Sequence, residues 1–341
     1  MLDISVVIPC FDANETLGLQ LEALSRQVDP PAFEVIVVDN RSATPPDEIV
    51  AAWQGRLANL RLVRATEAQG ISVARNVGVR EARTDKIILC DADDAAGSTF
   101  VRAAFEGLEQ ADFVTGAVTL IEAAEFDQGL DHVWDMLGPG TDPYGPLDFT
   151  HSDLDPAYPI MMGGACALTR GAIFSLDGWD QAFFPGVEDN DFALRLVDAG
   201  YTLGKSWAMT LAERGRATNA AAFRRAYDGG LMHMKLCAAH DLWATSPHLH
   251  DPPWYVDLAK LPAVAVTMLV RPRGQRDVLG LAGRAGLRIG QAAGFWRYRV
   301  RRATVDPDCG VGLHRANATA TPSEPSRARR WAHPPSPREG A

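Results

Sequence analysis

The sequence predicts an α/β protein built on an open, mostly parallel β-sheet flanked by helices. Short apolar runs alternate along the first half of the chain with segments whose apolar residues recur at helical spacing. Buried parallel strands are continuously apolar because helices cover both faces of their sheet. One such run, residues 87–90, is followed at once by Asp91, Asp93 and Asp94. A cluster of carboxylates cannot be buried in a sheet core, so it must lie at the strand's carboxyl end, where such sheets bind ligands.

Four strands are expected in the first 90 residues, at residues 4–8, 34–38, 60–63 and 86–90. Asn14 is expected to cap a helix after the first strand, because leucines follow it at helical spacing. Another helix is expected over residues 70–82. Right-handed crossovers through these helices would place the four strands parallel in one sheet.

The middle of the chain is expected to extend the sheet with a strand near residues 112–120. Residues 138–158 are rich in Pro, Gly and Asp and are expected to form a long loop, which in a folded domain is usually functional. A tight turn at Gly163 and Gly164 then leads into a strand, and a helix is expected over residues 191–199.

The composition changes after about residue 240. Residues 261–270 are apolar but too few to span a bilayer. Residues 271–302 hold nine arginines and one acid, interleaved with apolar side chains, which suits an amphipathic helix at a membrane surface. The alternative is a basic helix packed on the protein's own acidic body. Residues 303–341 are expected to be disordered, because Pro, Ser, Ala and Arg dominate there.

Charge is unevenly distributed over the 341 residues, whose formal net charge is −10 at pH 7. Residues 1–270 carry 19 basic and 38 acidic side chains, whereas residues 271–341 carry 14 basic and 5 acidic ones. An acidic body argues against nucleic acid as a partner, and a basic end suits an anionic membrane. The five scattered cysteines indicate neither a disulfide framework nor a zinc site. No secretory signal is recognisable, so we expect a cytoplasmic protein, either free or peripheral at the inner face of the membrane.

Polar clusters follow the expected strands or open a helix, at residues 9–12, 39–40, 91–94 and 186–191. The carboxyl ends of parallel strands meet at one edge of a sheet, so these clusters are expected to gather there. Carboxylates at i and i+2 can share Mg²⁺ or Mn²⁺ with substrate phosphates. A solvated turn or a helix cap is the alternative for any single cluster.

The order and spacing of several motifs resemble the family 2 glycosyltransferases, whose domain has the GT-A fold. The resemblance covers about residues 3–235. It rests on Val6-Val7-Ile8-Pro9, Val37-Val38-Asp39-Asn40, Ala74-Arg75-Asn76-Val77-Gly78, Asp91-Ala92-Asp93-Asp94, Gly163-Gly164-Ala165 with Leu176-Asp177-Gly178-Trp179-Asp180, and Glu188-Asp189-Asn190-Asp191-Phe192. It implies a GT-A domain over residues 1–240, and the change in composition after it predicts a helical, basic extension over residues 241–302. The Gln-x-x-Arg-Trp motif of the processive synthases is not found, so transfer of single sugars is expected.

The resemblance implies a binding site for a nucleotide sugar, with a UDP-type donor favoured. Asp39 matches the acid that recognises the base, since its carboxylate would accept the imide N–H of uracil; a helix N-cap is its alternative role. Arg75 and Asn76 match residues that line the nucleotide pocket. Pro9 and Asp12 belong to the loop after the first strand, where Asp12 replaces the family's usual Asn.

The resemblance also implies metal-assisted chemistry. Asp93 would hold a Mn²⁺ or Mg²⁺ ion that bridges the donor phosphates, and Asp91 would contact the ribose or a metal-bound water. Asp189 matches the base that accepts the acceptor hydroxyl's proton in one inverting displacement. Glu188 would act on Asp189 through its like charge, and Asp191 is either a third candidate base or a helix cap. A looser match lets Arg214 and Arg216 reach the diphosphate.

The acceptor is expected to be a saccharide or a lipid-linked molecule in cell-envelope glycan or glycolipid synthesis. Two other functions stay open. A nucleotidyltransferase would normally have a glycine-rich, basic loop after the first strand, where this chain has Cys10-Phe11-Asp12-Ala13. A catalytically silent nucleotide-sugar-binding scaffold is disfavoured because Asp93 and Asp189 are both present.

Overall fold

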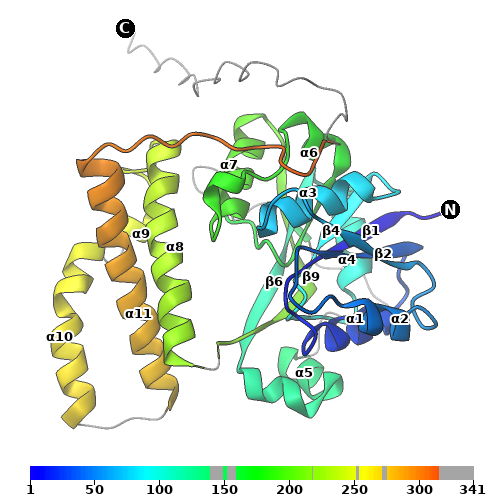
Figure 1. Ribbon diagram of the computed structural model, residues 1–341, viewed down its shortest axis with the longest axis horizontal. Helices are drawn as coiled ribbons and strands as arrows, with labels where there is room; N and C mark the ends of the chain where they lie inside the picture. The colour runs from blue at the N-terminus through cyan, green and yellow to red at the C-terminus, as the bar shows by residue number, and fades with distance from the viewer. Residues whose placement is uncertain (139–148, 152–158, 217, 251–252, 271–274, 315–341) are drawn as a thin grey trace, which may run out of the picture.

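The computed structural model describes residues 1–138, 149–151, 159–216, 218–250, 253–270 and 275–314. Its strands are β1 (Ile4–Cys10), β2 (Phe33–Asp39), β3 (Leu60–Arg64), β4 (Lys86–Leu89), β5 (Ala95–Ala96), β6 (Phe113–Ile121), β7 (Phe149–His151), β8 (Cys166–Thr169) and β9 (Leu203–Arg214). They form one sheet in the order β3-β2-β1-β4-β8-β6-β9-β5, and β7 pairs with β9 (Figure 1).

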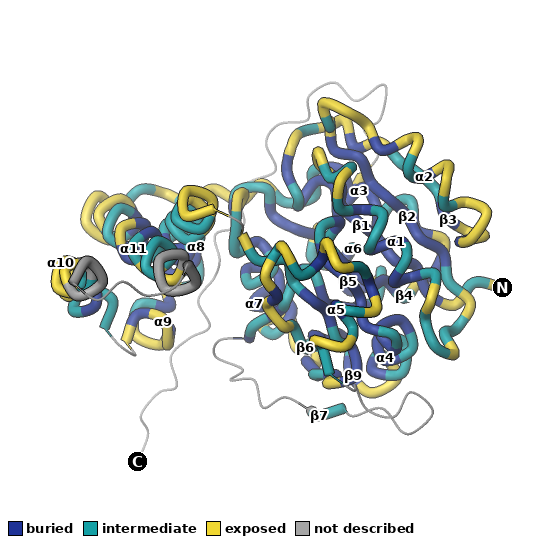
Figure 2. The backbone as a smooth tube through the Cα atoms, turned by 90° about the horizontal axis from the view of Figure 1, so that it is seen from below, coloured by how far each residue is buried: buried dark blue, intermediate teal, exposed yellow. Residues whose placement is uncertain are grey.

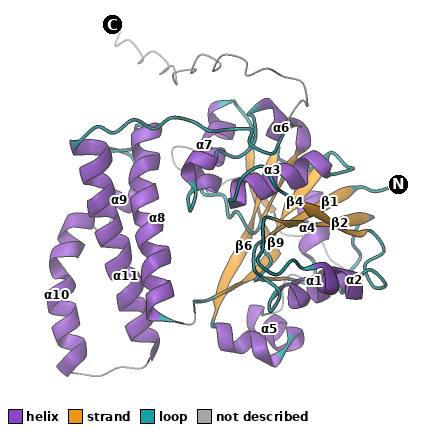
Figure 3. Cartoon of the chain, viewed as in Figure 1, coloured by secondary structure: helices purple, strands orange, loops and turns teal. Residues whose placement is uncertain are grey.

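The helices of the sheet body are α1 (Leu17–Ser25), α2 (Asp47–Trp53), α3 (Ile71–Glu81), α4 (Phe100–Gly107), α5 (Leu130–Leu137), α6 (Arg170–Ser175) and α7 (Glu188–Asp198). Short 3₁₀ turns lie at Ala123–Gln128 and Gln181–Phe183. Helices α1, α2, α4 and α5 cover one face of the sheet, and α3, α6 and α7 cover the other (Figure 3). The predicted α/β fold is confirmed.

The sheet is mixed rather than parallel throughout. β1 pairs in parallel with β2 and β4, and β2 pairs in parallel with β3, as the βα repeat of the sequence predicts. Strand β8 runs antiparallel to both β4 and β6, which reverses the direction in the second half of the sheet. That half contains no regular βα repeat, so sequence periodicity offered no sign of its strand directions.

Both faces of the central strands are buried, which explains why these strands are continuously apolar. In β1, Val6 and Ile8 pack in the core under α1 and α4, whereas Val7 packs under α3. Figure 2 shows this buried interior running through the whole sheet body. Burial on both faces stabilises each strand by roughly 25 cal/mol per Å² of apolar surface removed from water.

The prediction that Asn14 caps the first helix is wrong. α1 begins at Leu17, and Thr16, not Asn14, occupies the N-cap position. The Asn14 side chain instead donates to the backbone oxygen of Thr44 at 3.1 Å. Asn14 therefore ties together two loops at the carboxyl edge of the sheet, a long-range contact that helix periodicity does not indicate.

Four helices form a second layer beside the sheet body: α8 (Asn219–Ala239), α9 (Pro247–His250), α10 (Trp254–Val270) and α11 (Gln275–Gly294), which ends in a π-helical turn at Phe295–Val300 (Figures 1 and 2). We call α8 to α11 with this turn the helical layer. The predicted domain boundary at residue 240 falls at the end of α8. The sequence therefore assigned α8 to the GT-A domain, whereas in the structure it packs with the C-terminal helices. Within the described ranges, no helix is both long and apolar enough to cross a membrane.

The basic segment 271–302 contributes α11, although residues 271–274 lie outside the described residues. α11 packs along α8, and its Arg284 and Arg288 donate to Asp257 of α10. These ion pairs hold the pKa of Asp257 well below its usual range. Two of the arginines of this segment are therefore paired with an acid inside the helical layer.

The prediction of disorder from residue 303 onward is wrong for residues 303–314, which we call the C-terminal strap; residues 315–341 lie outside the described residues. The strap returns from the helical layer to the sheet body (Figure 1). There Asn76 and Arg80 of α3 donate to the backbone oxygens of Val311 and Gly312 at 3.0 and 2.8 Å. Leu313 is only 1% exposed. Leu313, a few partly buried apolar side chains and hydrogen bonds to backbone groups order a segment whose composition predicts a disordered tail.

Ending the chain after residue 302 removes the strap and is expected to lower the free energy of unfolding by about 2–4 kcal/mol. The loss combines the burial of Leu313 with the hydrogen bonds from α3. A chain that ends after residue 314 keeps these contacts and serves as the control. Urea denaturation measures both, and equal midpoints would contradict a stabilising strap.

Candidate active site

Several of the polar clusters predicted from the sequence lie at the same edge of the sheet, where its parallel strands end. β1 pairs in parallel with β2 and with β4, and Cys10 at its end lies beside Asp39 at the end of β2. The turn at residues 91–94 follows β4 after a single residue, Cys90. Asp12, Asp39 and this turn therefore share the carboxyl edge of the sheet.

A pocket of about 430 Å³ opens at this edge, a size suited to a small polar ligand. It is formed by α3, the turn after β4, the segment before α7, the end of β9 and the first turns of α8. Its charged lining residues are Arg75, Asp91, Asp93, Asp94, Glu188, Asp189, Glu213, Arg216 and Arg225. Five predicted site residues are thus brought together: Arg75, Asp91, Asp93, Glu188 and Asp189.

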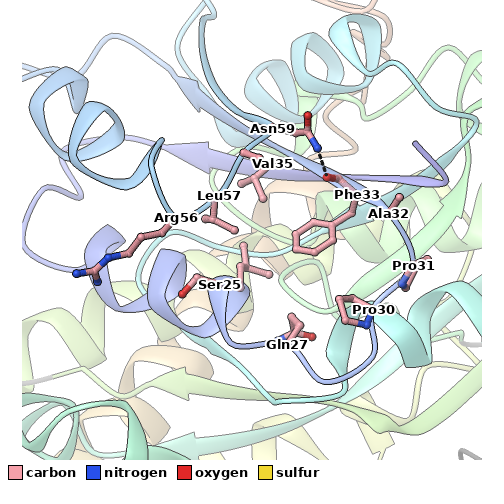
Figure 4. A pocket seen from close by; sticks show the side chains of 12 residues that line it. Ser25, Gln27, Pro30, Pro31, Ala32, Phe33, Val35, Arg56, Leu57 and Asn59 are labelled. Atoms are coloured by element: carbon pink, nitrogen blue, oxygen red, sulfur yellow. Dashed lines mark hydrogen bonds between the residues drawn. The ribbon is translucent and has the colours of Figure 1, made fainter. Parts of the chain in front are cut away.

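A second pocket, of about 290 Å³, lies at the opposite edge of the sheet beside the start of β2 (Figure 4). Its lining includes Ser25, Phe33 and Leu57, and Asn59 donates to the backbone oxygen of Phe33 there. Arg56 is the only charged residue among those that line it. Without an acid or a base in its wall, this pocket is not the candidate active site.

Arg75 of α3 is the positive centre of the first pocket, although its side chain is only 2% exposed. Its Nη1 donates to Oε1 of Glu188 at 2.9 Å, and its Nη2 lies 3.6 Å from Oδ1 of Asp91. Burial lowers the pKa of Arg75, but Glu188, Asp91 and Asp189 raise it more, so the net shift is upward. A buried cation must be matched by nearby anions, and Arg75 therefore links α3 to the turn after β4 and to the start of α7.

The carboxyl groups around Arg75 are crowded. Burial raises the pKa of Glu188 to about 7, with the charge of Asp189 adding to the rise and Arg75 opposing it. Burial raises the pKa of Asp94 to about 8, and the neighbouring Asp91 and Asp93 add to it. Such shifts are typical of functional sites. A bound cation would relieve this repulsion.

Asp189 is held in place by backbone donors. The N–H of Gly163 donates to Oδ2 of Asp189 at 3.0 Å, and the N–H of Asn190 donates to Oδ1 at 2.8 Å. A Cβ on Gly163 would lie 2.6 Å from Nη2 of Arg75, and one on Gly164 would lie 2.8 Å from Oδ2 of Asp91. The two glycines therefore allow the chain to pass close to the charged cluster, which explains this motif physically.

The residue before this acidic pair is strained. Val187 lies in the left-handed region with φ 64° and ψ 12°, which a β-branched side chain rarely adopts. It immediately precedes Glu188 and Asp189 in the first turn of α7, where the helix dipole favours negative charge. Strain of this kind is concentrated at functional sites.

Asp191, the third candidate base, is not part of the pocket. It is 1% exposed, accepts from Nε of Arg195 at 2.9 Å and lies 2.8 Å from Nε2 of His240. Arg195 belongs to α7 itself, and the contact with His240 attaches α7 to the end of α8. The alternatives for the base are thus reduced to Asp189 and Glu188, and Glu188 is paired with Arg75.

The structure corrects the prediction that Asn76 lines the nucleotide pocket. Asn76 is fully buried, and its Nδ2 donates to the backbone oxygens of Trp179 and Val311, both at 3.0 Å. Its Oδ1 accepts from the N–H of Trp179 at 2.9 Å. With its side chain saturated in this way, Asn76 clamps α3 to residues 176–180, which we call the Trp179 turn, and to the strap.

Asp39, Asp12 and Pro9 lie at the same edge of the sheet but do not line the pocket. Asp39 is buried, and its Oδ2 accepts from Nη1 of Arg64 at 2.7 Å. The alternative role of Asp39 as a helix cap is wrong, because α2 begins only at Asp47. Recognition of a base by Asp39 stays a prediction.

Of the two arginines expected to reach the diphosphate, only Arg214 lies outside the pocket lining. Arg214 does not point into the pocket. Its Nε donates to the backbone oxygen of Asp93 at 2.9 Å, and its backbone N–H donates to Oδ1 of Asp94 at 2.9 Å. It therefore holds the turn at residues 91–94. Arg216 lines the pocket, with Nη1 3.5 Å from Oδ2 of Asp93. Arg225 of α8 was missed, because no motif relates this helix to the acids.

The residues present fit a divalent cation only with help from a ligand. Among the described residues, no three His, Cys, Asp or Glu side chains lie close enough to form a complete metal site. Oδ1 of Asp91 is buried without a hydrogen-bond partner, and Asp93 is 37% exposed and lines the pocket. Two carboxylates of this kind suit Mg²⁺ or Mn²⁺ when phosphate and water oxygens supply the other ligands.

Residues 5–173 match the sequence model of glycosyl transferase family 2. This domain belongs to that family. The uncharacterized glycosyltransferase YwdF of Bacillus subtilis is 31% identical over 126 residues, which cover 36% of this chain and 45% of that protein. The chain spans less than half of the length of the first curated relatives that it matches.

Two solved structures share the fold of this chain. The mannosyltransferase PcManGT of Pyrobaculum calidifontis, in complex with GDP-Man and Mn²⁺, superposes with a TM-score of 0.57 at 18% identity over 86% of this chain and 87% of that one. Staphylococcus aureus TarS 1–349 in complex with UDP gives a TM-score of 0.50 at 15% identity over 88% and 92%. The predicted GT-A fold is confirmed.

Gly163→Ala is expected to displace Arg75 or Asp189, because the added Cβ would lie 2.6 and 2.9 Å from their side chains. Overpacking of this kind costs about 1–3 kcal/mol, so the melting temperature should fall by several degrees. Gly171→Ala on α6 meets nothing within 4 Å and is the matched control. Indistinguishable thermal unfolding of the two variants would argue against the close packing of Gly163.

Proposed function

We propose that this protein is a metal-dependent, inverting glycosyltransferase that moves single sugars from a nucleotide-sugar donor to an acceptor hydroxyl. The observation that carries the proposal is one pocket that combines Asp91 and Asp93 with Asp189 in a family 2 domain. The GDP-Man and UDP bound to proteins of the same fold support a nucleotide-sugar ligand.

Asp189 is the proposed base. Its carboxylate lines the pocket and is oriented by two backbone N–H groups, which supports its role as acceptor of the proton from the acceptor hydroxyl. As the hydroxyl oxygen bonds to the anomeric carbon, the bond from that carbon to the phosphate oxygen breaks, and the nucleoside diphosphate leaves. One displacement of this kind inverts the anomeric centre. Glu188 neutralises Arg75 and supports Asp189 from the next position.

Asp93 and Asp91 are the proposed ligands of Mn²⁺ or Mg²⁺. A cation bound there would stabilise the negative charge that develops on the leaving diphosphate. Arg75 contacts both Asp91 of the turn and Glu188 of α7, and so fixes these two carboxylates relative to each other. Asp39, at the same edge, is proposed to recognise the base of a UDP-type donor.

The acceptor is proposed to be a saccharide or a lipid-linked molecule of the cell envelope. The poly(ribitol-phosphate) β-N-acetylglucosaminyltransferase TarS of Staphylococcus aureus is 30% identical over 96 residues, which cover 28% of this chain and 17% of TarS. Its name gives poly(ribitol phosphate) as the acceptor of that protein, which supports a hydroxyl-bearing polymer as one kind of acceptor here. A cytoplasmic location is proposed to accompany this role.

The reaction is tested by measuring nucleoside diphosphate released from UDP, GDP and dTDP sugars with Mn²⁺. At least one donor should be cleaved, and Asp189→Asn should lower the rate by about 100-fold or more, since a positioned base contributes on this order. Asp93→Asn should weaken the dependence on Mn²⁺. Asp198→Asn, exposed at the far end of α7, is the matched control and should retain the rate.

Other products would contradict the proposal. Release of pyrophosphate from a nucleoside triphosphate would favour a nucleotidyltransferase. Binding of a donor without release, unchanged in Asp93→Asn and Asp189→Asn, would favour the silent scaffold.

We also propose that the helical layer touches the inner face of the membrane through the end of segment 271–302. Trp296 and Val300 are exposed there, next to the exposed Arg297, Arg299 and Arg301. Exposed aromatic and aliphatic groups among arginines suit the headgroup region of an anionic bilayer.

The double substitution Trp296→Ser and Arg301→Gln should reduce flotation with vesicles containing anionic phosphatidylserine by roughly fivefold or more, since one surface arginine contributes about 1 kcal/mol. Point substitutions are preferred to deletion of residues 271–341, which would also remove α11 from α8. Arg56→Gln, exposed on the sheet body, is the control. Recovery of the parent and both variants in the soluble fraction would rule out the membrane contact.

A further inference from the structure

The helical layer supplies a charged residue to the pocket. Arg225 lies near the start of α8 and lines the pocket that contains the acids of the sheet edge. Its Nη2 is 3.4 Å from Oε1 of Glu213, and its side chain is 63% exposed. Burial raises the pKa of Asp91, and the charges of Arg75 and then Arg225 oppose that rise, so Arg225 acts electrostatically on the acid cluster.

The three arginines that line the pocket differ in how firmly they are bound. Arg75 is buried against Glu188, whereas Arg216 and Arg225 are partly exposed and make only long ion pairs, of 3.5 and 3.4 Å. Exposed pairs of this kind contribute little, so exchanging a carboxylate for another anion costs little. A guanidinium that turns toward a phosphate gains strong, forked hydrogen bonds.

The position of Arg225 depends on how α8 packs. A Cβ on Gly286 of α11 would lie 2.2 Å from the backbone oxygen of Phe223, and one on Gly290 would lie 2.1 Å from that of Tyr227. From the other side, a Cβ on Gly230 of α8 would lie 2.3 Å from the backbone oxygen of Leu287. We call these contacts the glycine seam; they bring the two helices to backbone contact on both sides of Arg225. In Figure 1, α8 lies between α11 and the sheet body.

We propose that Arg225 binds a phosphate of the donor's diphosphate, and that the glycine seam between α8 and α11 holds Arg225 at the pocket. The inference rests on the proposed function, because it takes a nucleoside diphosphate as the ligand. It makes the helical layer a wall of the donor site. Gly286 and Gly290 act as positioning residues, since the atoms nearest to their added Cβ positions lie on α8 and neither glycine lines the pocket.

The role of Arg225 is tested by calorimetric titration of UDP, GDP and dTDP into the full chain with Mn²⁺. For the nucleotide that the parent binds, Arg225→Ala should weaken affinity by about 10- to 100-fold, as expected for a lost hydrogen bond to a charged group. Arg224→Ala removes the same charge from the adjacent, exposed position, which does not line the pocket, and should leave affinity unchanged.

The seam is tested by Gly290→Ala, whose Cβ would press on the backbone of Tyr227, so that α8 must move. Its affinity for the same nucleotide should fall several-fold while the circular dichroism of the helices is retained. Gly283→Ala, also on α11, meets nothing within 4 Å and should match the parent. If Gly290→Ala does not fold, the titration of Arg225→Ala still decides the contact with phosphate.

The outcomes distinguish failure of the proposed donor from failure of the role given to Arg225. A parent protein that binds none of the three nucleotides would contradict the proposed donor. A parent that binds one of them, with Arg225→Ala binding equally well, would overturn this inference and leave the proposed function standing. Equal weakening by Arg224→Ala and Arg225→Ala would also overturn it, because the effect would then be one of general charge.

Discussion

A guanidinium buried beneath the edge of a sheet must have anions beside it, and Arg75 obtains them from two distant parts of the chain. Glu188 comes from the start of α7, and Asp91 from the turn after β4. Neither carboxylate would tolerate this crowded position without the cation, and the cation would not tolerate burial without them. The separation of the acidic turn from the start of α7 therefore follows from one interaction.

That interaction also explains the surroundings of the site. Arg75 can keep its position only if α3 is anchored, and the adjacent Asn76 anchors it to the Trp179 turn and the C-terminal strap. The glycines at 163 and 164 leave room for the guanidinium and for Asp91. Arg214 fixes the acidic turn from the opposite side through backbone groups. Asn76, the two glycines and Arg214 therefore hold the charged cluster in place without lining the pocket through their own charged groups, apart from the glycines, whose backbone borders it.

The helical layer extends this arrangement across the pocket. A GT-A sheet edge alone presents mainly carboxylates in this chain, which suits a metal ion better than a diphosphate. Arg216 and Arg225 add positive charge on the other wall, the second of them from a helix that reaches the pocket through close packing with α11. The carboxylates of the sheet edge therefore share one cavity with two arginines from its other wall.

Local sequence was sufficient for the strands of the first half and for the carboxylates at their ends. A continuous apolar run such as residues 87–90 can only be buried, and the acids after it can only lie at its end. Similarly, the spacing of motifs identified the GT-A domain and five residues that share the pocket. The antiparallel half of the sheet, the clamp of Asn76, the ion pairs of Asp191 and the approach of Arg225 depended on packing between distant segments. Asn76 and Val311 are separated by 235 positions, and Asp191 and His240 by 49. No local pattern specifies such partners, because side chains acquire them only when the helices and the strap have docked.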